Sequence, residues 1–218
     1  MTNNGFIPKH GGYQELKSFQ NAVIVYDFTV EFCKRYVPAH KLRDQLEGAA
    51  RSGTQNIAEG SANSGTSKQT ELRLVSVARG SLEELLRDYK DYLRQHEFTE
   101  WNRDDSRAQE VRALAYKTNR SYRTYKSYMG KPDDAANCAV CLIHQTNFLL
   151  DQQMRALEKD LFSKGDVQEQ FRDARSAERK RQLLDGGPPL DEFLAEQGFV
   201  RLENGQVVRK LPDASSSV

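Results

Sequence analysis

Apolar side chains recur at alternating steps of three and four residues through most of the first 130 residues of this chain. This spacing places them along one side of an α-helix, as in the contact seams of helical bundles. Pro38 disfavours helix at the residue before it and so ends the first such segment, residues 13–37. The spaced positions in that segment are Leu16, Phe19, Val23, Tyr26, Val30, Cys33 and Val37. The pattern therefore predicts an all-α fold.

A second apolar row lies on a neighbouring face of the first predicted helix and consists of Val25, Phe28 and Phe32. A helix that is apolar on two faces needs cover on both, and we expect a single bundle to cover only one of them. We therefore expect Val25, Phe28 and Phe32 to form an interface between copies of the chain.

The second predicted helix, residues 39–60, is short of large side chains at its centre. Glycines stand at positions 48, 53 and 60, and each costs about 0.5–1 kcal/mol relative to alanine in a helix interior. Such glycines usually accompany the close approach of a bulky group. The third predicted helix, residues 68–96, offers one, because Arg79 falls in its apolar seam. We expect the small residues to make room for Arg79.

A guanidinium buried in a seam needs a carboxylate, because an unpaired buried charge costs several kcal/mol. In an antiparallel arrangement Asp27 and Glu31 of the first helix lie near the level of Arg79, whereas Glu59 lies roughly 15 Å away along the axis. Asp27 or Glu31 is therefore the expected partner. The alternative is that Arg79 extends out of the seam into solvent.

A fourth helix is predicted over residues 104–129, and one of its faces is basic. Between Arg107 and Lys126 six Lys and Arg residues stand against one acid, Glu110, which gives a local charge of +5 in a chain whose net charge is +1. A basic face with aromatic neighbours suits a polyanion, although such faces are often merely solvated. The predicted nucleic-acid-binding residues are Arg112, Tyr116, Lys117, Arg120, Arg123 and Lys126.

Four helices joined by short loops predict an antiparallel up-down-up-down bundle over residues 13–130, preceded by a tail, residues 1–12. Residues 131–185 are expected to form a helical extension that docks on this bundle. Gly and Pro interrupt the pattern from residue 186, and residues 186–218 form a tail. In that tail Asn204-Gly205, the favoured pair for a tight turn, predicts a short β-hairpin.

Several kinds of chemistry find no support in the sequence. Cys138, Cys141 and His144 have metal-ligand chemistry, but structural zinc needs a fourth ligand, and three positions spread over about 120° of a helix diverge. No histidine stands beside a nucleophile, and the loop GSANSG lacks the Lys of a phosphate-binding loop. We therefore expect no enzyme activity, no metal and no cofactor.

The compartment follows from what the chain lacks. No apolar run reaches the roughly 18 residues of a membrane span, and the first residues, MTNNGFIPKHGG, contain no apolar core of a signal peptide. Three cysteines are an odd number, which favours reduced thiols over a disulfide framework. We expect a cytoplasmic protein without membrane contact.

Two separated motifs resemble a known family. RSGTQNIAEG (Arg51–Gly60) and VARGSLEEL (Val77–Leu85) are similar to paired motifs of the bacterial four-helix-bundle proteins, also called ribosomal-RNA intervening-sequence proteins. The family includes the accessory variability determinant of diversity-generating retroelements, and residues 142–161 resemble a C-terminal suffix carried by some members. The resemblance covers residues 13–128. Its motif positions here are Asn56, Glu59, Gly60, Arg79 and Gly80.

The resemblance implies a homopentamer of bundles and, for the retroelement member, binding to a reverse transcriptase and to nucleic acid. This chain is longer and more nearly neutral than the retroelement proteins. We expect a non-enzymatic, oligomeric accessory protein that binds RNA or DNA. The alternative is a scaffold that binds protein partners without nucleic acid.

Overall fold

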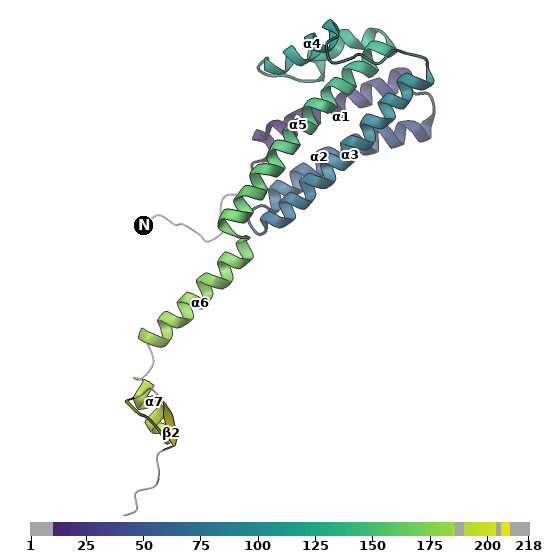
Figure 1. Ribbon diagram of the computed structural model, residues 1–218. Coiled ribbons are helices and arrows are strands. Elements are labelled where there is room, and N and C mark those ends of the chain that lie inside the picture. The colour runs from purple at the N-terminus through teal and green to yellow at the C-terminus, as the bar shows by residue number, and fades with distance from the viewer. Residues whose placement is uncertain (1–10, 186–189, 204–205, 210–218) are drawn as a thin grey trace, which may run out of the picture. The chain divides into compact units, whose positions relative to one another are not determined.

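The computed structural model describes residues 11–185, 190–203 and 206–209, and most of them are helical (Figure 1). Two compact units divide the chain after Gln168. The first unit contains a short 3₁₀ turn, η1 (Tyr13–Glu15), and the long helices α1 (Lys17–Tyr36), α2 (His40–Asn63), α3 (Lys68–Gln95) and α5 (Pro132–Lys164). The predicted all-α fold is confirmed.

The second unit holds most of α6 (Val167–Asp185), then α7 (Leu190–Glu196) and a two-stranded antiparallel sheet. Its strands are β1 (Phe199–Arg201) and β2 (Val207–Arg209), with Val200 opposite Val208. The predicted hairpin is therefore confirmed, while its predicted turn, Asn204-Gly205, lies outside the described residues, as do most of the tail 1–12 and residues 186–189.

Four helices form the bundle of the first unit: α2 packs against α1 and α3, and α5 packs against both α1 and α3 (Figure 1). Each helix is antiparallel to the one before it. At one end Ser67 Oγ, which caps α3, donates a hydrogen bond of 2.9 Å to Asp166, just after α5. At the other end Trp101 N donates one of 2.7 Å to Asn137 Oδ1, near the start of α5. The up-down-up-down order is thus present.

The fourth helix of the bundle is not the predicted one. Residues 104–129 do not form a single helix but α4 (Ser106–Ala113) and two 3₁₀ segments, η2 (Leu114–Tyr116) and η3 (Tyr122–Gly130). Asn119 has a positive φ of 54°, which is not helical, and Ser121 caps the start of η3. These two polar residues interrupt the predicted helix between η2 and η3. Pro132, at the first position of α5, begins the real fourth helix instead. The bundle therefore extends to residue 164 rather than ending at residue 130.

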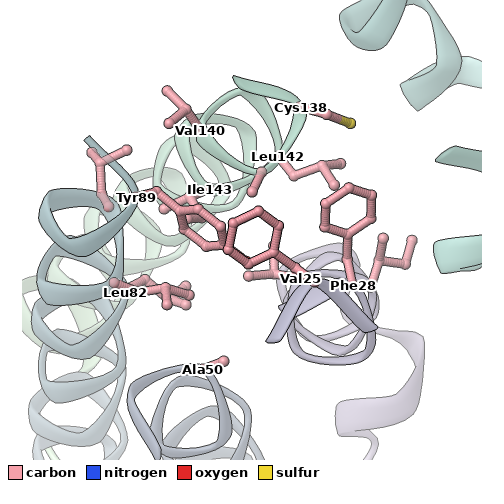
Figure 2. Packing of buried hydrophobic residues seen from close by; sticks show 14 of the residues in the cluster. Val25, Phe28, Ala50, Leu82, Tyr89, Cys138, Val140, Leu142 and Ile143 are labelled. Atoms are coloured by element: carbon pink, nitrogen blue, oxygen red, sulfur yellow. The ribbon is translucent and has the colours of Figure 1, made fainter. Parts of the chain in front are cut away.

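The predicted oligomer interface is wrong. Val25 is 2% exposed and Phe28 and Phe32 are 0% exposed within this one chain. Figure 2 shows Phe28 pointing toward Leu142 of α5. The helix α1 is apolar on two faces because it contacts α2, α5 and η3 of its own chain. The sequence pattern places α5 outside the bundle and therefore provides no cover for the second face.

The small residues of α2 make room for Leu82, not for Arg79. A Cβ atom added at Gly53 would lie 2.8 Å from Leu82 Cδ2, and one added at Gly60 would lie 3.3 Å from the carbonyl oxygen of Glu71. Ser52 and Ser81 also form a hydroxyl–hydroxyl hydrogen bond of 3.0 Å across the same contact. Because Gly53 and Gly60 have no side chain, α2 and α3 can pack in close contact.

Candidate functional site

A basic segment connects α4 to α5. Residues 111–132 contain no Asp or Glu but six Lys and Arg residues. Because the segment is broken into η2, a turn and η3, its basic residues do not share one face of a helix as predicted. The six are Arg112, Lys117, Arg120, Arg123, Lys126 and Lys131.

The turn and η3 are held by hydrogen bonds at both ends. Ser121 Oγ accepts from Arg123 N at 3.3 Å, and Ser121 N donates to Thr124 Oγ1 at 3.2 Å, which is a reciprocal cap. At the far end Tyr36 of α1 donates its hydroxyl hydrogen to the carbonyl oxygen of Met129 at 2.6 Å. Since Met129 is also buried, η3 is fixed against α1.

Two of the predicted binding residues have structural contacts. Arg120 is half-buried, and its guanidinium donates to Asn21 Oδ1 of α1 at 2.8 Å and to the hydroxyl of buried Tyr125 at 3.3 Å. Arg112 is half-buried as well and donates to the carbonyl oxygen of Arg103. Both side chains therefore hold the segment to the rest of the unit, which a sequence pattern does not reveal.

The other predicted residues lie at the surface. Lys117, Arg123 and Lys126 are exposed, and among the described residues none of them has a carboxylate within salt-bridge distance. Tyr116 is 91% exposed, which is unusual for an aromatic ring. We call Tyr116, Lys117, Arg123 and Lys126 the basic surface. It combines positive charge with an aromatic ring and no nearby acid in the sequence.

Arg79 has different partners from those predicted. Its guanidinium forms salt bridges to Glu83 at 2.6 Å and to Asp151 of α5 at 3.1 Å, with 30% of the side chain exposed. Glu31 instead pairs with Arg35 at 2.6 Å, and burial raises the pKa of Asp27. The prediction failed because Arg79 lies on the flank of α3 beside α5, the helix that the sequence pattern had left outside the bundle.

The family-like motif residues do not form one site. Gly60 is buried where α2 meets α3, whereas Glu59 and Gly80 are exposed, and no atom lies within 4 Å of a Cβ added at Gly80. Asn56 donates to the carbonyl oxygen of Ser52 at 2.8 Å, within its own helix. Of these residues Gly60 has a clear packing role.

Cys138, Cys141 and His144 diverge on α5, as their spacing indicates. Cys138 is buried in the core, Cys141 is half-buried and His144 is exposed. Within the described residues no group of three or more His, Cys, Asp or Glu side chains is arranged to hold a metal ion. In the same part of the chain no helix is long and apolar enough to cross a membrane.

The thiols of α5 should react slowly in the folded protein. Burial raises the pKa of Cys141 to about 11 and that of Cys138 well above its ordinary value. At pH 8 the thiolate fraction of Cys141 is then about a hundredfold below that of a free cysteine. We expect iodoacetamide to label Cys141 about a hundredfold more slowly than glutathione, with the rate rising as the pH approaches 11. Mass spectrometry of labelled peptides measures this, and labelling at the rate of glutathione would contradict it.

Comparisons with protein-family models, curated proteins and solved structures find no match to this chain.

Proposed function

We propose that this protein is a non-enzymatic nucleic-acid-binding protein that contacts single-stranded RNA or DNA through the basic surface. The observation that carries this proposal is the exposure of Lys117, Arg123 and Lys126 in a stretch of 22 residues without an acid, residues 111–132. Unpaired cations bind phosphates by releasing condensed counterions, and the exposed ring of Tyr116 is suited to stacking on a base.

The fold supports this role by presenting the cations on a fixed backbone. The reciprocal cap at Ser121 and the tether from Arg120 to Asn21 hold the turn that carries Lys117 and the start of η3 that carries Arg123. A surface that is ordered before binding loses less conformational entropy when a strand binds. The net charge of +1 leaves this local surface, rather than the whole molecule, as the source of attraction.

The proposal is tested with the triple variant Lys117→Ala, Arg123→Ala, Lys126→Ala. We expect it to bind a fluorescent single-stranded oligonucleotide at least about tenfold more weakly than wild type at 50 mM salt. The slope of log K against log salt should also become shallower by about 2, since each lost phosphate contact contributes about 0.7. Arg120 is left intact because it holds the segment to α1. Fluorescence anisotropy at several salt concentrations gives both quantities.

The matched control removes three exposed cations elsewhere, with the variant Lys41→Ala, Arg51→Ala, Arg73→Ala on α2 and α3. It changes the net charge equally but leaves the basic surface unchanged. Equal losses in both triple variants would show that overall charge, not this surface, attracts the strand. Unchanged binding by the first variant would refute the proposal.

A second candidate function is a scaffold for protein partners. It is favoured by Phe162 and Phe148 of α5, which are 93% and 61% exposed. Apolar docking depends little on salt, so a partner held by these rings would stay bound where nucleic acid dissociates. The homopentamer and the reverse-transcriptase partner implied by the resemblance remain predictions, the former without the interface first assigned to it. Sedimentation measures the oligomeric state directly.

A further inference from the structure

A pocket of about 640 Å³ opens in the first unit between the loop before α4, α4 itself and the middle of α5. This volume falls in the range of about 300–1,000 Å³ that is typical of small-molecule sites. Six of its lining residues carry the argument: Trp101, Arg103, Arg112, His144, Gln145 and Phe148.

Aromatic rings form part of the wall. Phe148 is 61% exposed although it lines a concavity, so its ring is available to a ligand. Trp101 is 8% exposed and is held in place by the Arg107 guanidinium, 4.7 Å from the centre of its ring, and by an edge contact with Tyr128. An exposed ring beside a fixed indole favours a flat, aromatic ligand.

Hydrogen-bonding groups lie in the same wall. Gln145 Oε1 is buried and accepts no hydrogen bond from the described residues, which leaves an acceptor for an N–H group. Although part of the His144 side chain is exposed, partial desolvation and the nearby Lys90 lower its pKa, so its neutral ring offers one donor and one acceptor at pH 7. An amide and a neutral imidazole match the mixed donors and acceptors on the edge of a nucleobase.

Positive charge completes the lining. Arg103 and Arg112 both contribute to the pocket, and Arg112, which donates one N–H to the carbonyl oxygen of Arg103, keeps its other N–H groups for a ligand. The acid in the wall, Glu100, is paired with Lys90 at 2.8 Å. Arginine favours phosphate because its planar fork binds two oxygens at once. Arg112 also begins the acid-free stretch that carries the basic surface.

We propose that this pocket holds the base of one nucleotide of the bound strand. Phe148 stacks on the base, Gln145 and His144 contact its polar edge, and Arg103 and Arg112 contact a phosphate. This inference rests on the proposed function and adds to it a second contact to a base, inside a pocket, beside the stacking at Tyr116.

Trp101 makes the test specific, because it is the single tryptophan of the chain and lines the pocket. Wild-type protein is titrated with a single-stranded DNA 12-mer and with an abasic 12-mer that has the same phosphates. We expect the strand with bases to change Trp101 fluorescence and to bind about five- to 150-fold more tightly, the range that one stacked base contributes. The abasic strand should leave Trp101 fluorescence unchanged.

The variant Phe148→Ala should lose most of this preference while binding the abasic strand as wild type does. Because Phe148 is 61% exposed, the substitution should leave the fold intact, which far-ultraviolet circular dichroism checks. Phe162→Ala is the matched control, since Phe162 is a 93% exposed phenylalanine of the same helix outside the pocket lining, and it should keep the full preference.

The outcomes separate the two proposals. If Phe148→Ala changes neither affinity and neither strand changes Trp101 fluorescence, the base pocket is refuted, while binding through the basic surface stands. If wild type binds neither strand, and binds no RNA of the same length, the proposed function is refuted and the base pocket with it.

Discussion

Phe28→Asp abolishes cooperative folding of the protein instead of separating folded subunits. Phe28 is 0% exposed in the core between α1 and α5, so the substitution removes a packed ring and buries a charge without a partner. Loss of a buried phenylalanine alone costs about 3–5 kcal/mol, and a buried charge adds several more. Since domains are stable by about 5–15 kcal/mol, little stability should remain. Circular dichroism during heating measures this, and the variant should show no cooperative loss of helical signal.

The control for this experiment is Phe162→Asp, which places the same charge at a 93% exposed position of α5. It should change the melting temperature by no more than a few degrees. A Phe28→Asp variant that keeps its helical content and melts as wild type does, but sediments as a smaller particle, would restore the interface assignment and contradict the fold described above.

Gly53→Val should produce the second largest loss of stability. The new Cβ would lie 2.8 Å from Cδ2 and 2.9 Å from Cγ of Leu82, a side chain that is itself 0% exposed and would have to shift within the core. Overpacking of this kind costs about 1–3 kcal/mol. For a domain of this size that lowers the melting temperature by roughly 2–4 °C for each kcal/mol. Chemical denaturation measures the free energy of unfolding.

Gly48→Ala is the matched control on the same helix. No atom lies within 4 Å of a Cβ added at Gly48, so the alanine should stabilise α2 by about 0.5–1 kcal/mol. Adding Leu82→Ala to Gly53→Val should recover part of the lost stability, because the smaller side chain vacates the contact. If Gly53→Val were as stable as wild type, α2 and α3 would have to lie farther apart than this fold places them.

The first three helices could be predicted nearly to their ends from the sequence. The predicted segments 13–37, 39–60 and 68–96 correspond to α1 (Lys17–Tyr36), α2 (His40–Asn63) and α3 (Lys68–Gln95). Their boundaries depend on local signals, such as Pro38 and the Ser67 cap, which act within a few residues. The β-hairpin was predictable for the same reason.

The basic surface was only partly predictable. The sequence alone identifies residues 111–132 as free of Asp and Glu, because the charge of a segment depends only on its residue types. Whether a given cation is free is a different question: Arg120 reaches Asn21, which is 99 residues away in the sequence, while Arg123 stays exposed. The pocket was missed because its walls come from two separate segments, around Trp101 and His144, that no spacing rule connects.

The sequence by itself determined that this protein is helical, where its first three helices begin and end, and where its positive charge is concentrated. The tertiary structure alone decided that α5 completes the bundle, that η3 covers α1, and that Arg79 pairs with Asp151. The physical reason is the distance along the sequence between the residues that interact. Helix periodicity and caps are set by neighbours three or four residues apart, whereas the choice of which apolar face covers another depends on packing between residues that are far apart in the chain.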